Sequence, residues 1–158
     1  MTQSAVPPAD DRLDARHEYL PGYVDHFGSR SDNRTILIVE DDESIAELLG
    51  DLLSGEGYRV VVVHDGRAGL AYARREHPAM VLSDCMLPGV SGTEMAAALR
   101  KQSATRHIPI ALMSSTRPKG LNLPGVPFLA KPFEIDDVLN LVARCMREQP
   151  YAQLYGEA

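Results

Sequence analysis

Short apolar runs alternate with segments of helical periodicity from residue 34 onward. The first run, Ile36–Val39, is continuous and mostly β-branched, which is typical of a strand buried on both faces of a sheet. After it, leucine and isoleucine recur at spacings of three and four residues, which predicts a helix with one apolar face. The residues on this face are Ile45, Leu48, Leu49, Leu52 and Leu53.

The same alternation continues to residue 146. It predicts further strands at 58–63, 79–83, 108–113 and 126–130, and further helices at 68–76, 91–102 and 135–146. Short, apolar strands that alternate with helices indicate a parallel sheet with helices on both faces. Because such crossovers are right-handed, we expect a flavodoxin-like, doubly wound α/β fold with five parallel strands in the order 2-1-3-4-5.

The segment between the fourth and fifth predicted strands departs from this regular alternation. It contains Pro118, Gly120, Pro124, Gly125 and Pro127. A proline in a helix interior costs about 3 kcal/mol and a glycine about 1 kcal/mol. We therefore predict that the fourth helix is shortened to one turn at most or replaced by a loop.

The two ends of the chain have a different character. Residues 1–33 are rich in Pro, Asp, Arg and Ser and show no sustained apolar period, and residues 149–158 form a short tail. We assign the domain to residues 34–148 and interpret 1–33 as a disordered extension. The alternative is a docking arm, either for a partner or for the domain itself.

Composition narrows the class of protein. A length of 158 residues suits a single domain, and a net charge of −6 argues against binding to the nucleic-acid backbone. We find no apolar segment long enough to span a membrane and no secretory signal, and we expect a cytoplasmic protein. Cys85 and Cys145 lack metal-type spacing and are interpreted as reduced thiols. His64 and His77 are interpreted as surface residues.

Polar residues follow the predicted strands where each one ends. Glu40 and Asp41 follow the first strand, Asp84 the third, Ser114 the fourth and Lys131 the fifth. In open α/β sheets, ligands bind beyond the carboxyl ends of the strands, so these side chains are expected to converge on one edge. A single polar residue at a strand end is common, but chance does not readily explain the whole set.

The chemistry of this set points to a metal and a phosphoryl group. Crowded carboxylates repel one another unless a cation lies among them, and Mg²⁺ (or Mn²⁺) suits a few carboxylates completed by water and phosphate oxygens. Lys131 supplies a positive charge to phosphate oxygens and Ser114 a hydroxyl donor. A carboxylate in such a site can act as a nucleophile and become an aspartyl phosphate.

Three segments carry a resemblance to a known family. They are Ile-Leu-Ile-Val-Glu-Asp-Asp at 36–42, Ser-Asp-Cys-Met-Leu-Pro-Gly at 83–89 and Ala-Lys-Pro-Phe at 130–133. Together they resemble the response-regulator receiver family of two-component signalling, from about residue 34 to 146. The resemblance implies that Asp84 accepts a phosphoryl group from a sensor histidine kinase or a histidine phosphotransfer protein. It implies metal binding by Glu40, Asp41, Asp84 and the Met86 carbonyl, and a cis peptide after Lys131.

The resemblance also implies roles for neighbouring residues. Ser114 matches the hydroxyl residue that follows the phosphoryl group on activation, and Phe128 matches the aromatic switch residue, with core packing as its alternative. Met86 and Thr116 occupy the positions that set the lifetime of the phosphoryl group. Because Met86 has no strong donor or acceptor to orient water, we expect no fast hydrolysis assisted from that position. Asp42 is interpreted as an acid in the first turn of a helix and not as a ligand.

The leading hypothesis is a stand-alone receiver, because only about ten residues follow the last predicted helix. Such a protein acts through protein contacts or passes the phosphoryl group onward, and it is not a conventional enzyme. We expect a monomer or weak dimer, because the altered fourth helix belongs to the family's usual dimer face. The alternative is a receiver-like interaction module that works without phosphorylation. An aspartyl-phosphate phosphatase is disfavoured, because Met86 stands where that class has a second Asp.

Overall fold

Parallel strands and helices alternate along the chain in the computed structural model, which describes residues 24–26, 34–119 and 122–147. The parallel strands are β2 (Thr35–Val39), β3 (Arg59–Val63), β4 (Met80–Asp84), β5 (Ile110–Ser114) and β6 (Phe128–Ala130). The helices are α1 (Glu43–Gly55), α2 (Gly66–Glu76), α3 (Gly92–Lys101) and α4 (Ile135–Arg147).

The sheet has the predicted topology. Its order is β1-β3-β2-β4-β5-β6, so the five parallel strands follow the doubly wound order 2-1-3-4-5. The sequence did not predict the sixth strand, β1 (Val24–His26), which pairs antiparallel with β3 and aligns Val24 with Val62. This strand comes from the 1–33 extension and covers the edge of β3, an edge that would otherwise leave backbone groups unpaired. The remainder of that extension and the 149–158 tail lie outside the described residues.

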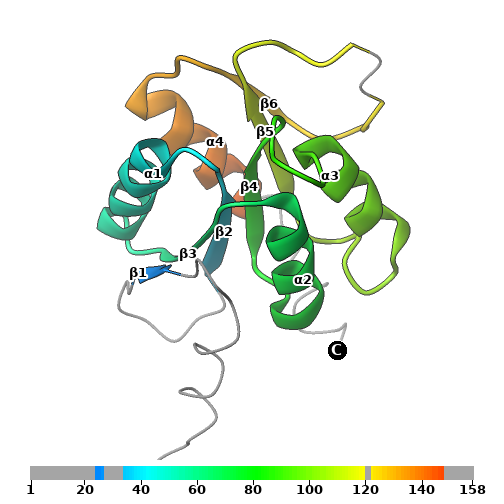
Figure 1. The fold of residues 1–158 in the computed structure, drawn as a ribbon. Coiled ribbons are helices and arrows are strands. Elements are labelled where there is room, and N and C mark those ends of the chain that lie inside the picture. Colours follow the sequence, from blue (N-terminus) through cyan, green and yellow to red (C-terminus); the bar gives the residue numbers. More distant parts are fainter. Residues whose placement is uncertain (1–23, 27–33, 120–121, 148–158) are drawn as a thin grey trace, which may run out of the picture.

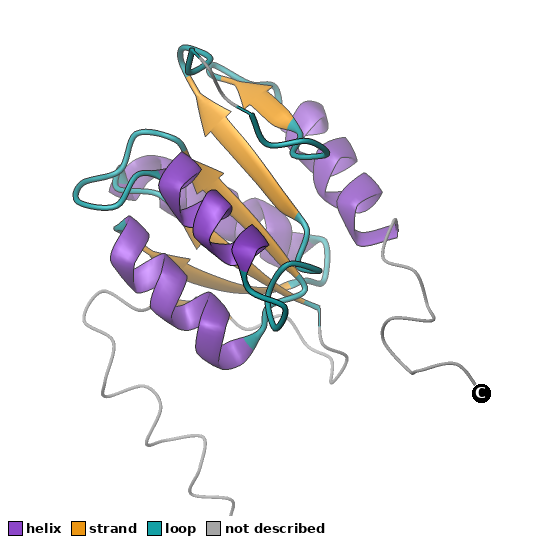
Figure 2. Ribbon diagram, turned by 90° about the vertical axis from the view of Figure 1, so that its right-hand side faces the viewer, coloured by secondary structure: helices purple, strands orange, loops and turns teal. Residues whose placement is uncertain are grey.

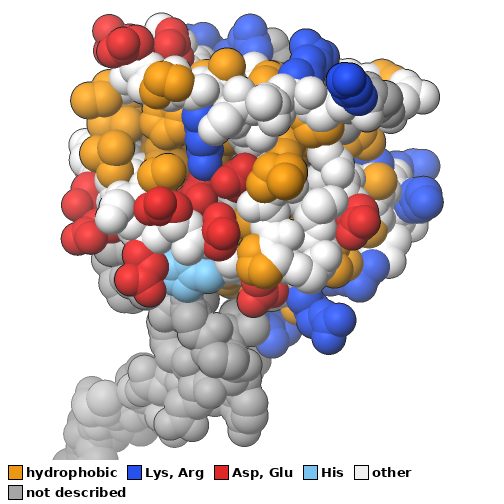
Figure 3. Space-filling view, turned by 45° about the horizontal axis from the view of Figure 1, so that its top comes forward, with side chains coloured by type: hydrophobic (Ala, Val, Ile, Leu, Met, Phe, Trp, Pro, Cys, Tyr) orange, Lys and Arg blue, Asp and Glu red, His pale blue; other side chains and the backbone are white. Residues whose placement is uncertain are grey.

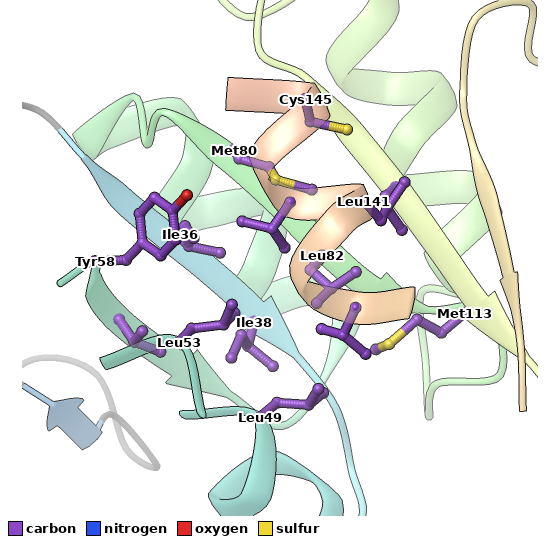
Figure 4. Close-up of a cluster of buried hydrophobic side chains, with 14 of the residues drawn as sticks. Ile36, Ile38, Leu49, Leu53, Tyr58, Met80, Leu82, Met113, Leu141 and Cys145 are labelled. Carbon is purple, nitrogen blue, oxygen red and sulfur yellow. The ribbon is translucent and has the colours of Figure 1, made fainter. Parts of the chain in front are cut away.

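Helices cover both faces of the sheet (Figures 1 and 2). Alternate residues of β2 point to opposite faces: Ile36 and Ile38 pack in the cluster with α1 and α4, and Leu37 and Val39 in the cluster with α2 and α3. Figure 4 shows the first cluster, in which side chains of α4 lie over those of β4. Because β2 is buried on both sides, its apolar run is continuous, as the sequence indicated.

Side-chain caps set where the helices begin. Asp65 accepts a hydrogen bond from the Ala68 amide at 2.7 Å, so α2 begins at Gly66 and not at residue 68. Asp42 accepts from the Ile45 amide at 3.0 Å and is the N-cap of α1, which corrects its assignment to the first turn. Ser91 and Glu94 form a reciprocal capping box at the start of α3.

Two prolines set where strands begin. The predicted strands at 108–113 and 126–130 begin two residues later in the structure, at Ile110 and Phe128. The residues directly before them are Pro109 and Pro127, which have no N–H to donate to the ladder.

The described residues between β5 and β6 lie in a loop. Its described residues, 115–119 and 122–127, form no helix, which confirms the prediction from its prolines and glycines. Arg100 of α3 donates to the carbonyl of Pro124 at 3.3 Å and ties the loop to the domain. Among the described helices, each is too short or too polar to cross a bilayer.

Candidate functional site

The polar residues at the strand ends come together at one edge of the sheet. Asp84 is the last residue of β4 and Ser114 the last of β5, while Glu40 and Lys131 directly follow β2 and β6. The parallel register aligns Asp84 with Met113 and Ser114 with Ala130, so these ends lie at neighbouring positions. Figure 3 shows acidic side chains gathered on this face of the molecule.

Three carboxylates form a compact cluster. One oxygen each of Glu40, Asp41 and Asp84 lies within 4.8 Å of the others. Glu40 is fully buried and Asp84 is 7% exposed, whereas Asp41 is open to solvent. Two buried carboxylates and one exposed carboxylate suit Mg²⁺, which keeps several of its waters. The donor set therefore fits the predicted metal.

Lys131 joins two of these carboxylates. Its Nζ donates to Glu40 Oε2 at 2.8 Å and to Asp84 Oδ2 at 2.9 Å. Its backbone N–H donates to the Ser114 carbonyl at 2.9 Å, and the peptide bond to Pro132 is cis, as the resemblance implied. Burial lowers the pKa of the Lys131 ammonium, but the hydrogen bonds to Glu40 and Asp84 outweigh burial and leave the pKa raised. Lys131 is therefore held in its charged form.

For the Glu40 carboxyl, burial outweighs the hydrogen bonds, and its pKa is raised. Removal from water raises the pKa of the Glu40 carboxyl, and the hydrogen bonds from Lys131 and from the Asp42 amide lower it only in part. The charge of Asp84 raises the same pKa further. One ammonium thus offsets the carboxylate charge incompletely, which favours binding of an additional cation.

Asp84 is fixed at both oxygens. The Met86 amide donates to Asp84 Oδ1 at 3.0 Å, and Lys131 holds Oδ2. The Met86 side chain is 71% exposed and points no polar atom at the site. The backbone of Met86, and not its side chain, therefore contacts the Asp84 carboxylate.

The predicted switch and lifetime residues lie beside this centre. Ser114 is buried, and its hydroxyl accepts a hydrogen bond from the amide of the exposed Thr116 at 3.4 Å. Phe128 is half-buried in the cluster that faces α2 and α3, with the Arg117 guanidinium carbon 5.6 Å from its ring centroid. The switch role of Ser114 and Phe128 stays a prediction.

His64 is a residue of this site that the sequence interpretation missed. It is half-buried rather than on the surface, and its Nδ1 lies 2.9 Å from the Glu40 carbonyl oxygen. His64 directly follows β3, which is the second strand predicted from the sequence. The rule that site residues follow the carboxyl ends of the strands would have identified it if it had been applied to that strand as well. His77 is also half-buried, and its ring stacks on that of His107 with centroids 6.5 Å apart.

Both cysteines are buried and form no disulfide. Cys85 follows Asp84 and packs in the cluster with α2 and α3. Burial, and then the charge of Asp84, raise the pKa of the Cys85 thiol to about 11. The thiol is therefore protonated at neutral pH and behaves as a small apolar group.

The family is shown by comparison with known proteins. Residues 36–143 match the model of the response regulator receiver domain, and the chain belongs to this family. Receiver domains are signalling domains.

Curated relatives agree with this assignment over the receiver region. The uncharacterized transcriptional regulatory protein YkoG of Bacillus subtilis is 37% identical over 118 residues, which cover 72% of this chain and 51% of the relative. The response regulator ArlR of Staphylococcus aureus is 35% identical over 117 residues, which cover 73% of this chain and 53% of the relative. The chain thus spans about half the length of these relatives, and its stand-alone status stays an expectation.

Solved structures share the fold. The receiver domain of the sensor histidine kinase PA1611 from Pseudomonas aeruginosa has a TM-score of 0.67 at 27% identity, over 73% of this chain and 98% of that one. That structure has a magnesium ion coordinated in its active site cleft. The chemotaxis response regulator CheY4 of Vibrio cholerae has a TM-score of 0.65 at 28% identity, over 70% and 97% of the two chains.

Proposed function

We propose that Asp84 accepts a phosphoryl group from a phosphohistidine of a sensor histidine kinase or histidine phosphotransfer protein. The observation that carries this proposal is the position of Lys131 Nζ, which lies within 2.9 Å of both Glu40 and Asp84. A cation held between an acid cluster and a potential nucleophile is placed to bind an oxygen of an incoming phosphoryl group.

The transfer itself is a substitution at phosphorus. An oxygen of the Asp84 carboxylate forms a bond to phosphorus while the bond from phosphorus to the donor imidazole nitrogen breaks, and that nitrogen keeps the electron pair. Glu40, Asp41, Asp84 and the Met86 carbonyl would hold Mg²⁺ or Mn²⁺. When bound, the ion neutralises the charge of the carboxylates and of the phosphoryl oxygens.

The proposed output is a change in protein contacts. Ser114 is a buried hydroxyl at the strand end next to Lys131 and would donate to a phosphoryl oxygen on Asp84. Movement of Ser114 would break its hydrogen bond with the amide of Thr116, the second residue of the loop that leads to Phe128. A charge change at Asp84 thereby biases the loop at 115–127 and the surface that it forms.

The test is phosphorylation by acetyl phosphate in the presence of Mg²⁺, followed by intact-mass measurement. We expect an acid-stable, base-labile phosphoryl adduct on the wild type and none on Asp84→Asn. Asp42→Asn is the matched control, because Asp42 is a nearby acid that caps α1 and stands outside the carboxylate cluster. No adduct on the wild type with acetyl phosphate or phosphorylated kinase would overturn the proposal.

A second candidate is a receiver-like interaction module that needs no phosphorylation. The specific observation in its favour is the loop at 115–127, because the described residues form no helix between β5 and β6. The same mass experiment separates the two functions. Partner binding that is identical for the wild type and Asp84→Asn, with no adduct on either, would favour the second.

A further inference from the structure

The loop between β4 and α3, residues 85–91, carries the backbone of the proposed site. Met86 lies in this loop, and its amide holds Asp84 Oδ1. The path of the loop therefore determines where the Met86 carbonyl stands relative to the three carboxylates. Two glycines, each the first residue of a helix, touch the backbone at the two ends of this loop.

Gly92 is the first of these glycines and begins α3. Its N–H donates to the Cys85 carbonyl at 2.9 Å, which closes the loop. A Cβ at this position would lie 2.0 Å from the carbonyl oxygen of Asp84. The start of α3 thus rests directly on the backbone of the acceptor residue.

Gly66 is the second glycine and begins α2, on a different part of the chain. A Cβ at this position would lie 1.8 Å from the carbonyl oxygen of Val90. The Val90 oxygen is a backbone atom and not the end of a flexible side chain, so the loop and the start of α2 would have to move apart by about 1 Å. Gly66 thus sets how closely α2 approaches the loop.

We propose that Gly66 and Gly92 are positioning residues that fix the β4–α3 loop and thereby the metal-binding geometry at Met86 and Asp84. This inference rests on the proposed function and extends it to a residue of α2 that touches none of the acids in the cluster. Mg²⁺ requires nearly ideal octahedral geometry at about 2.1 Å, so a shift of the loop by about 1 Å weakens its binding.

The test is Mg²⁺ affinity, measured by titration calorimetry on the full chain at a temperature where every variant is folded. We expect Gly66→Ala and Gly92→Ala each to weaken Mg²⁺ binding by about 10-fold or more, the range found when groups that orient metal ligands are lost. Melting temperatures are recorded in parallel, because a purely structural role lowers stability without changing the affinity of the folded protein.

Two further glycines provide matched controls. At Gly69 a Cβ would meet the side-chain atoms Met95 Sδ at 2.8 Å and Val39 Cγ2 at 2.9 Å, so Gly69→Ala disturbs the packing of the same helix without touching the loop backbone. A Cβ at Gly55 would meet nothing within 4 Å beyond its neighbours in the chain and the backbone of its own helix. We expect both controls to retain the wild-type affinity for Mg²⁺, whatever Gly69→Ala does to stability.

The outcomes are distinguishable from a failure of the proposed function. If the wild type binds no Mg²⁺, the proposed function fails and this inference fails with it. If the wild type binds Mg²⁺ and accepts a phosphoryl group, but Gly66→Ala binds Mg²⁺ as well as Gly69→Ala does, only the role of Gly66 is overturned.

A measurement on the wild type covers the case in which Gly66→Ala does not fold. Hydrogen exchange is followed with and without Mg²⁺ at the Ala68 and Gly69 amides, which bond to Asp65 in the first turn of α2. We expect Mg²⁺ to slow exchange there and in the loop, with no change at the Tyr58 amide beyond the far end of α1. Unchanged exchange in the first turn of α2 would overturn the inference.

Discussion

The Lys131 ammonium donates to the Glu40 carboxylate at 2.8 Å, although 91 positions separate the two residues along the chain. Both side chains are largely buried, at 13% and 1% exposure. The parallel sheet makes this contact, because it brings the ends of β2 and β6 to the same edge. Lys131 is thus one ammonium beside a cluster of three carboxylates, and the first three predictions below depend on that imbalance of charge.

Removal of the ammonium should destabilise the protein in the absence of metal. Lys131→Met leaves Glu40 and Asp84 without their shared cation, and breaking a buried ion pair costs on the order of 3 kcal/mol. Urea unfolding measures this loss. Lys119→Met, at an exposed lysine, is the control and should change the free energy of unfolding by less than about 0.5 kcal/mol. Equal losses in the two variants would contradict the importance of the buried pair.

Mg²⁺ should stabilise the folded protein. A ligand that binds only the folded state adds about 2.7 kcal/mol at 100 times its Kd. We expect MgCl₂ to raise the melting temperature of the wild type, and to do so much less for Asp41→Asn and Asp84→Asn. Asp42→Asn should keep the full Mg²⁺-dependent increase, and its starting stability should stay close to that of the wild type, because Asn caps a helix about as well as Asp. An equal rise in melting temperature in all the variants would show that Mg²⁺ binds outside the carboxylate cluster.

The pKa of Glu40 predicts how stability depends on pH without metal. Burial raises this pKa above its value in the unfolded chain, so the folded protein binds a proton more tightly than the unfolded chain does. This contribution is fully present below the pKa of 4.5 of the unfolded chain and is lost as the pH rises through the folded pKa. Relative to Glu40→Gln, the wild type should therefore gain stability as the pH falls from neutral. Urea unfolding of both proteins across this range would show a constant difference if the idea were wrong.

The lifetime of the phosphoryl group should respond to Met86. Its side chain is 71% exposed beside Asp84 and offers no strong donor or acceptor to an attacking water. Met86→Asn adds a hydrogen-bond donor and an acceptor at this position and should therefore shorten the lifetime of the phosphoryl group. The lifetime is measured as the loss of the phosphoryl adduct with time. Leu87→Asn, at the next position along the same loop, is the control. A lifetime of seconds in the wild type, unchanged in Met86→Asn, would count against this role.

The Cys85 thiol should be unreactive in the folded protein. It is 2% exposed, and burial together with the charge of Asp84 raises its pKa to about 11. Cys145 is also buried. Iodoacetamide at neutral pH should therefore modify neither cysteine until urea unfolds the chain, as followed by intact mass. Rapid labelling of Cys85 under native conditions would show that the region around Asp84 opens.

Local patterns in the sequence determined most of the architecture. The strands β2 to β5 are short, mainly apolar runs because both of their faces are buried. The apolar periodicity of Ile45–Leu53 predicted α1. The absence of a helix from residues 115–119 and 122–127 was equally predictable, since several prolines and glycines in one short segment make a helix there costly. The rule that ligands bind beyond the carboxyl ends of parallel strands then grouped Glu40, Asp84, Ser114 and Lys131.

The tertiary structure decided the features that depend on contacts between distant segments. The antiparallel pairing of Val24–His26 with β3 needed an open sheet edge, which no local pattern of 1–33 reveals. The bond between His64 and the Glu40 carbonyl, and the close approach of Gly66 to Val90, depend on how neighbouring strands and helices meet. The sequence by itself therefore determined which polar groups meet at the edge of the sheet, because residue type and strand position are local. The backbone that orients those groups was decided by packing, because each of these contacts joins segments that lie far apart in the chain.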